Sequence, residues 1–96
     1  MLFRSFELIP MHHRQKSFGG NARVQIDENG NMYLHSYHSV VVAVTAEGWC
    51  LLHDKAACSP TTRKHVNEFL LQREIISRGL SKKELEAKIG EAFKAL

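Results

Sequence analysis

Residues 22–36 read ARVQIDENGNMYLHS, and this stretch decides the fold. Its first five residues alternate between apolar and polar side chains, which is the two-residue period of a strand with one buried face. Asn29-Gly30 follows, and this dipeptide is a strong hairpin signal because both central positions of a type I′ turn need positive φ. Residues 32–36 are therefore predicted to return antiparallel to residues 22–26.

Further strands are predicted on both sides of this hairpin. Residues 2–8 alternate moderately well, and residues 40–45 form a β-branched, almost fully apolar run that suits a central strand. Residues 49–53 follow the turn around Gly48 and give one more strand. The sequence thus predicts an antiparallel sheet of about four to five strands over about residues 2–53.

Two amphipathic helices are predicted after the sheet. Ser59-Pro60 suits a helix start, because the serine side chain accepts from an orphan backbone N–H and proline at the first helical position lacks a donor. This helix is expected over about residues 60–78, with Gly79 as its C-cap. The sequence SKKE at residues 81–84 is a capping box, and it predicts a second helix over about residues 82–95.

Length and composition indicate one domain. A chain of 96 residues, 44% hydrophobic and 24% charged, is near the average of globular proteins and has room for one core. We therefore expect a single α+β domain over residues 1–96, with its helices packed on the sheet or extending into a partner. The chain lacks a signal-peptide pattern and any apolar run of the roughly 18 residues that span a bilayer, which predicts a cytoplasmic protein.

The net charge of +3 is unevenly distributed. Residues 49–96 hold nine Lys or Arg against six Asp or Glu, whereas residues 1–48 are balanced. This excess makes nucleic-acid binding the alternative function, although glutamates interrupt the basic positions and a solvated mixed-charge surface is favoured. The candidate nucleic-acid contacts are Arg63, Lys64, Arg73, Arg78, Lys82, Lys83 and Lys88.

Side chains that carry chemistry show no recognisable catalytic arrangement. His65 and Glu68 stand three residues apart on the predicted first helix, where they are spaced to meet on its surface. No serine or cysteine stands in a nucleophile elbow, and no glycine loop is built to hold phosphate. His12-His13 is expected on an exposed loop, and Cys50 and Cys58 are expected as free thiols. We therefore predict no enzymatic activity, no metal and no cofactor.

Three segments resemble a known family. They are KSFGG at residues 16–20, YLHSYHSVV at 33–41 and SPTTRKHVNEFLLQ at 59–72. They are similar to the K-x-F-x-G-K-A, L-x-S-Y-x-T-x-V-A and S-x-T-T-x-x-H-I-x-E-F-L-x-Q patterns of small proteins encoded by phages, prophages and plasmids. Departures are Asn21 in place of lysine and Ser39 in place of threonine. The resemblance implies a bacterial mobile genetic element, and it implies no mechanism.

The favoured hypothesis is a non-enzymatic accessory protein that binds a host protein. Small size and the resemblance suggest an inhibitor of an anti-phage defence, for example an anti-CRISPR protein acting on a CRISPR effector. The apolar stripe of the second helix would anchor a helix-in-groove contact or a homodimer. The remaining alternative is an enzyme that uses His65 and Glu68. The candidate partner-binding residues are Tyr37, His38, Thr62, His65, Glu68, Leu85, Ile89 and Phe93.

Overall fold

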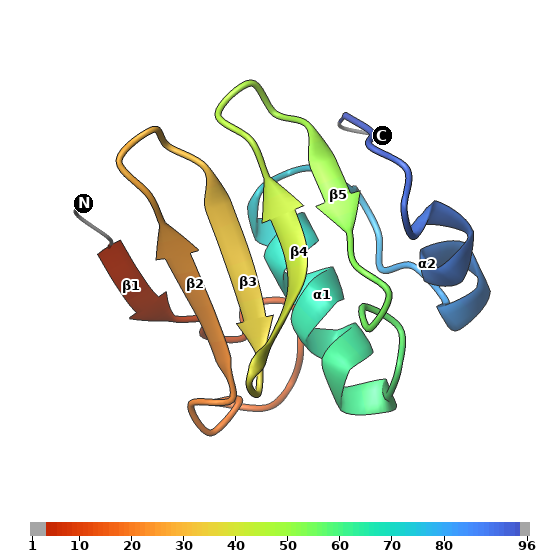
Figure 1. The fold of residues 1–96 in the computed structure, drawn as a ribbon. Coiled ribbons are helices and arrows are strands. Elements are labelled where there is room, and N and C mark those ends of the chain that lie inside the picture. The colour runs from red at the N-terminus through yellow and green to blue at the C-terminus, as the bar shows by residue number, and fades with distance from the viewer. Residues whose placement is uncertain (1–3, 95–96) are drawn as a thin grey trace.

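Five strands and two helices make up the described part of this computed structural model, residues 4–94 (Figure 1). The strands form one antiparallel sheet in the order β1-β2-β3-β4-β5, which confirms the predicted α+β fold. Residues 2, 3 and 95, which fall in predicted elements, lie outside the described residues. The bounds are β1 Arg4–Glu7, β2 Ala22–Ile26, β3 Met32–Ser36, β4 Ser39–Val44, β5 Cys50–Leu52, α1 Pro60–Gln72 and α2 Lys82–Lys88.

The predicted hairpin is present as β2 and β3, with Ile26 opposite Met32. Its turn differs from the predicted type I′ turn, because Gly30 has φ +86° while Asn29 does not have positive φ. The Gly30 N–H donates to the Asp27 carbonyl at 3.1 Å, and the Asp27 N–H donates to the Asn31 carbonyl at 3.0 Å. These bonds describe a type I turn followed by a glycine bulge, which needs only one left-handed residue.

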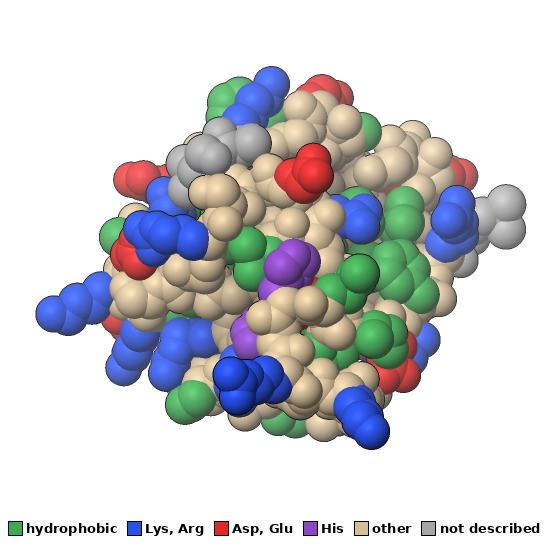
Figure 2. All heavy atoms as spheres, turned by 180° about the vertical axis from the view of Figure 1, so that it is seen from behind, with side chains coloured by type: hydrophobic (Ala, Val, Ile, Leu, Met, Phe, Trp, Pro, Cys, Tyr) green, Lys and Arg blue, Asp and Glu red, His purple; other side chains and the backbone are tan. Residues whose placement is uncertain are grey.

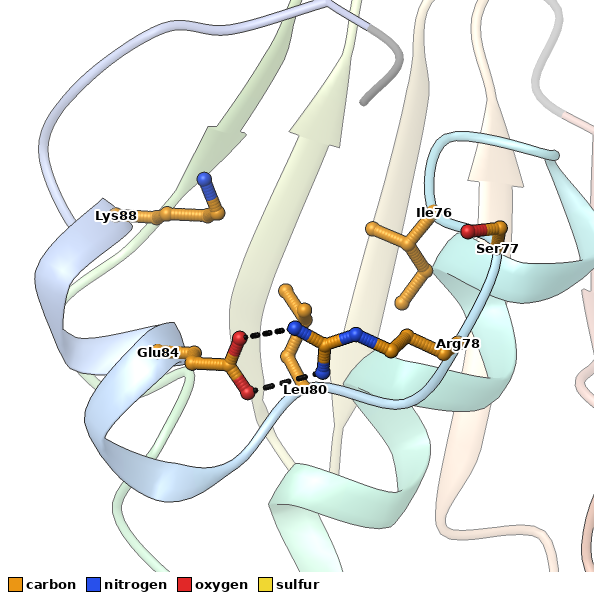
Figure 3. A pocket seen from close by; sticks show the side chains of 6 residues that line it. All are labelled: Ile76, Ser77, Arg78, Leu80, Glu84 and Lys88. Carbon is orange, nitrogen blue, oxygen red and sulfur yellow. Dashed lines mark hydrogen bonds and ion pairs between the residues drawn. The ribbon is translucent and has the colours of Figure 1, made fainter.

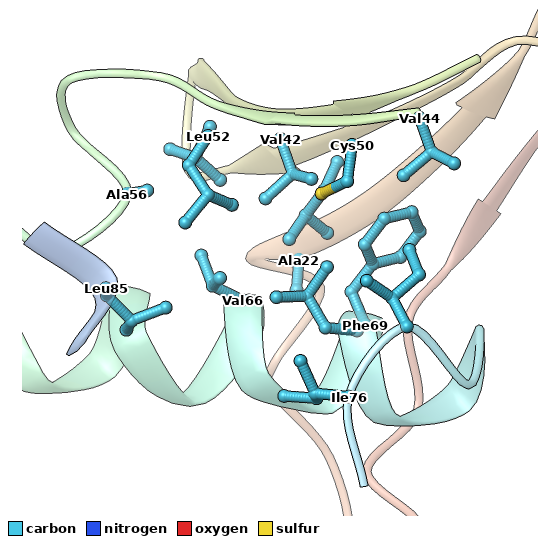
Figure 4. Packing of buried hydrophobic residues seen from close by; sticks show 14 of the residues in the cluster. Ala22, Val42, Val44, Cys50, Leu52, Ala56, Val66, Phe69, Ile76 and Leu85 are labelled. Carbon is cyan, nitrogen blue, oxygen red and sulfur yellow. The ribbon is translucent and has the colours of Figure 1, made fainter. Parts of the chain in front are cut away.

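Helices cover only one face of the sheet in the described chain. In Figure 1, α1 lies behind the strands and α2 lies beside β5, with no helix in front. Val24, Leu34 and Val42 pair across β2, β3 and β4 on the covered face, and all three are fully buried. Phe69 of α1 and Leu85 of α2 pack into the same core (Figure 4). Neither described helix is long and apolar enough to cross a membrane.

The first helix begins as predicted and ends earlier. Ser59 is its N-cap and accepts from the Thr62 N–H at 3.1 Å. The helix ends at Gln72 rather than near residue 78, because Glu74 takes a left-handed conformation with φ +59°. Ile75 and Ile76 then turn back into the core, where each is 5% exposed. The reversal therefore occurs at Glu74, and the prediction that Gly79 caps the helix was wrong.

The second helix has the predicted capping box but only seven residues. It ends at Lys88, and Gly90 follows with φ +83°. Up to residue 94, the chain then runs along the outer edge of β5 as non-helical backbone in place of the predicted longer helix. The Cys50 N–H donates to the Phe93 carbonyl at 2.6 Å, and the Phe93 N–H donates to the Cys50 carbonyl at 2.9 Å. Covering the edge of β5 thus replaces the predicted helical turns.

Candidate functional site

Three segments that are far apart in the sequence meet where α1 crosses the end of β3. They are the loop after β1, the end of β3 with the two-residue turn that follows it, and the inward face of α1. Their polar and aromatic side chains form a cluster between helix and sheet, here called the polar cluster. Its members are His12, His13, Phe18, Ser36, Tyr37, Thr62, His65, Glu68 and Gln72.

A chain of hydroxyl groups links α1 to the last residue of β3. Ser36 Oγ lies 2.8 Å from His65 Nδ1 and 3.1 Å from Thr62 Oγ1. The Ser59 hydroxyl donates to Thr62 Oγ1 at 3.1 Å. Thr62 and His65 share one face of α1 because residues three apart on a helix are neighbours, and Ser36 points to the same side as buried Leu34. These hydrogen bonds therefore fix the position of α1 relative to β3.

The His65 ring lies between two aromatic rings. Its centroid is 4.6 Å from that of Phe18, in an edge-on arrangement, and 5.8 Å from that of Tyr37. His65 is fully buried, and its Nε2 atom has no hydrogen-bond partner among the described residues. Burial lowers the pKa of His65, and the charge of nearby His13 acts in the same direction. The imidazole is therefore neutral at neutral pH.

The Glu68 carboxylate is fully buried and is surrounded by five N–H groups. Oε1 accepts from the Met11 N–H at 2.9 Å, the His12 N–H at 2.8 Å and His13 Nδ1 at 3.0 Å. Oε2 accepts from His12 Nδ1 at 2.7 Å and Gln72 Nε2 at 2.8 Å. Burial alone would raise the pKa of Glu68, but these hydrogen bonds, first those of the two histidine rings, lower it to about 2.

His65 and Glu68 are not hydrogen-bonded to each other. Both are 0% exposed, so the prediction that they meet on the helix surface was wrong. His65 is paired with Ser36, whose exposure is 3%, whereas Glu68 is paired with the loop after β1. The amphipathic pattern of α1 therefore carries two interior polar residues in place of a surface acid–base couple. Within residues 4–94, no group of three or more His, Cys, Asp or Glu side chains could hold a metal ion.

A comparison with known protein families identifies the family of this chain. The model of DUF8033, a family of unknown function, matches residues 6–87. The chain belongs to this family. No curated protein and no solved structure matches it. The DUF8033 match runs from β1 into α2 and includes every member of the polar cluster, so this cluster lies within the part of the fold that the family model describes.

The predicted partner-binding residues of this DUF8033 member fall into three groups. Tyr37 is 50% exposed, and His38 beside it is also exposed. Thr62, His65 and Glu68 are interior. Leu85 is fully buried, while Ile89 and Phe93 are half-buried and pack against the core. The structure places these three along the outer edge of β5, where Leu85 packs in the core and Ile89 and Phe93 form backbone bridges with Leu52 and Cys50.

Several predicted nucleic-acid contacts are held by their own chain. Arg78 pairs with Glu84 at 2.6 Å, and Lys88 Nζ lies 5.0 Å from the centre of the Phe93 ring. Arg63 donates to a backbone carbonyl of the loop before α1 at 3.1 Å. These contacts lower the number of cations that are free to meet phosphate. The remaining exposed members of the set are Lys64, Arg73, Lys82 and Lys83.

A small pocket of about 180 Å³ lies between α2 and the segment before it (Figure 3). The Arg78 guanidinium donates two hydrogen bonds to the Glu84 carboxylate, at 3.1 and 2.6 Å. The hydrogen bonds from Arg78 are the main reason that the pKa of Glu84 is lowered to about 2. Two of the three charged groups of the pocket, Arg78 and Glu84, are thus already paired with each other. Its lining residues are Ile76, Ser77, Arg78, Leu80, Glu84 and Lys88.

Sequence reasoning missed the role of His12 and His13, which were expected as surface histidines. Both rings donate to Glu68 and bring the loop after β1 onto α1. Figure 2 shows histidine side chains in the middle of the helix-bearing face, next to hydrophobic ones. The available signal was Glu68 itself, because a carboxylate among the apolar positions of an amphipathic helix needs donors from elsewhere in the chain.

Proposed function

We propose that this protein is a non-enzymatic binding protein that docks onto a host protein through the open face of its sheet. The observation that carries the proposal is that helices cover one sheet face only (Figure 1). The centre of the polar cluster is closed inside the molecule, with Ser36, His65 and Glu68 all nearly or fully buried. The open face is instead a broad surface built on five strands, and it presents side chains directly to solvent.

The open face is defined by two cross-strand rows. Partners opposite each other on adjacent strands share a face, so the face opposite buried Leu34 can be read from the register. Leu51 at one end of the face is 37% exposed, and Trp49 beside it is 46% exposed. Aromatic and apolar side chains mixed with polar ones are typical of protein interfaces. The rows are Ser5, Gln25, Tyr33, Ala43 and Leu51, and Glu7, Arg23, His35 and Val40.

The charges of the open face favour a protein partner over nucleic acid. Arg23 is the one Lys or Arg in the two rows, and Glu7 lies directly opposite it on β1. A phosphate backbone is bound by clusters of Lys and Arg, whereas a nearly neutral surface suits the nearly neutral surface of another protein. The nucleic-acid alternative depends on the helical half, where Arg63, Arg78 and Lys88 already have partners.

The partner class follows from the resemblance to proteins of phages, prophages and plasmids. A protein encoded by such an element acts in the cytoplasm of a bacterial host, and inhibition of a host defence is a function that a small binding protein performs without catalysis. A defence nuclease complex such as a CRISPR effector is therefore the first partner to test. In this proposal the protein inhibits by occupying a surface of that complex.

The test is an affinity pull-down of the tagged protein from bacterial lysate, with and without nuclease. Leu51→Glu places a negative charge on the open face. The control is Lys64→Glu, which places a negative charge at an exposed position of α1. We expect one near-stoichiometric protein that survives nuclease, is retained by the control and is lost with Leu51→Glu. Circular dichroism checks that both variants are folded. Nucleic acid that co-purifies equally with wild type and Leu51→Glu would contradict the proposal and support the basic helical half.

A further inference from the structure

The two edges of the sheet differ. The outer edge of β5 is covered, because Cys50 exchanges backbone hydrogen bonds with Phe93 and the Gly90 N–H donates to the Leu52 carbonyl at 3.1 Å. In the described residues, β1 pairs with β2 alone. An uncovered strand edge carries unpaired N–H and C=O groups, and such a row is a template for pairing with another chain.

The register shows which backbone groups of β1 are unpaired. The Leu8 N–H donates to the Ala22 carbonyl at 2.8 Å, which makes this an inward-bonded pair. Antiparallel strands alternate between bonded and non-bonded pairs, so Phe6 also points its backbone groups toward β2. The N–H and C=O groups of Ser5 and Glu7 therefore point away from the sheet.

Apolar side chains accompany this edge. Phe6 is 40% exposed, Ile9 49% and Met11 75%, so half of the six exposed large hydrophobic residues among residues 4–94 lie within one short stretch. Figure 2 shows hydrophobic side chains gathered between the histidines and the β1 edge of the helix-bearing face. Exposed apolar side chains beside an unpaired edge mark a surface that is stabilised by being covered.

We propose that β1 pairs antiparallel with β1 of a second copy, with Phe6 opposite the partner's Phe6. A two-fold axis perpendicular to the sheet keeps both helix layers on one side and joins two five-stranded sheets into one. Ser5 then lies opposite the partner's Glu7, and their outward backbone groups bond to each other. The two Phe6 rings meet in a non-bonded pair, where side chains are closest.

Charge complementarity identifies the second copy as the occupant. Arg23 donates to Ser5 Oγ at 3.3 Å, so its guanidinium lies beside the position that the partner's Glu7 takes in this register. The symmetry makes two such pairs of Arg23 with the partner's Glu7. A register centred on Glu7 would place two like charges together, and one centred on Ser5 would pair Ser5 with the partner's Ser5 and form no interchain pair of Glu7 with Arg23. The Phe6-centred register is thus the one that satisfies the charges of both chains.

The test is sedimentation equilibrium of the full chain over a range of concentrations. Wild type is expected as a dimer, and Glu7→Arg and Arg23→Glu are each expected to weaken dimerisation by about tenfold or more, because each places like charges across the interface. An equimolar mixture of the two variants is expected to restore the dimer, because every interchain pair is then attractive. Each variant also has like charges at positions 7 and 23 of the same chain, and this repulsion persists in the mixture. A loss of the dimer caused by misfolding would therefore not be reversed by mixing.

A backbone variant and a charge control complete the design. Ser5→Pro removes an outward N–H that β2 does not use, so it is expected to abolish the dimer and leave the circular dichroism spectrum unchanged. Lys64→Glu, an equal change of charge on the far side of the fold, is expected to leave the dimer intact. A monomeric wild type, or a dimer that tolerates both Ser5→Pro and the separate charge reversals, would overturn the proposal.

Discussion

Ser36 at the end of β3 and His65 in the middle of α1 are joined by a 2.8 Å hydrogen bond inside the molecule. Ser36 is 3% exposed and His65 is 0% exposed, so this contact does not compete with water. Together with the Glu68 carboxylate, it fastens α1 to the sheet on one side and to the loop after β1 on the other. The polar cluster thus holds the helix layer in place behind the open face of the sheet.

Removal of the Ser36 hydroxyl is expected to destabilise the fold. In Ser36→Ala, His65 loses its hydrogen bond, and both of its ring nitrogens are then buried without partners among the described residues. The free energy of unfolding should fall by about 1–3 kcal/mol, measured by urea denaturation. The control is Ser77→Ala at an exposed position, for which we expect a change within about 0.5 kcal/mol. An equal loss in both variants would show that the Ser36 contact is not stabilising.

Neutralising the Glu68 carboxylate is expected to release the loop after β1. Glu68→Gln keeps the shape but removes the charge that accepts from His12 and His13, and hydrogen bonds to charged groups contribute about 1.5–3 kcal/mol each. We expect a loss of at least about 2 kcal/mol and faster amide exchange in residues 9–17, measured by hydrogen exchange and mass spectrometry. Glu86→Gln, on an exposed position of α2, is the control.

Acid should weaken the same contact. The pKa of Glu68 is lowered to about 2 in the fold from its ordinary value of 4.5. Its contribution is therefore fully present above about pH 4.5 and is lost as the pH falls toward 2, because the unfolded chain takes up the proton first. The free energy of unfolding, measured by urea denaturation at several pH values between 4.5 and 2, should decrease more steeply with falling pH for wild type than for Glu68→Gln. Parallel curves for the two proteins would contradict the assignment.

The parts of the fold that local patterns determine were predictable, and the parts that distant contacts determine were not. Alternation in β2 and the turn residues after it predicted the hairpin, and Ser59-Pro60 predicted the start of α1. The Glu68 site depends on donors 56 residues earlier in the chain, which no local pattern reveals. Likewise, the short α2 results from the open edge of β5, which competes with further helical turns for the backbone of residues 89–93.

The turn between β3 and β4 is expected to prefer glycine over β-branched residues. Tyr37 has φ +56°, a left-handed conformation that costs most other residues about 1–2 kcal/mol. Tyr37→Gly and Tyr37→Val both remove the ring beside His65, so the loss of the ring cancels in their difference. The glycine variant should be more stable by about 1–2 kcal/mol in thermal or urea unfolding. At His38, where φ is not positive, the same pair should show no such advantage for glycine.

Leu85 is expected to anchor the C-terminal part of the chain to its own sheet. It is fully buried in the common core (Figure 4), and the segment that follows it forms backbone bridges with β5. Leu85→Ala should lower the free energy of unfolding by about 2–5 kcal/mol, because it removes buried methyl groups and leaves a cavity. Leu51→Ala, at a position 37% exposed on the open face, should cost about 1 kcal/mol or less and serves as the matched control. If the two variants lost equal stability in urea, Leu85 would not be packed as described, and a free α2 able to reach a partner would again be a reasonable hypothesis.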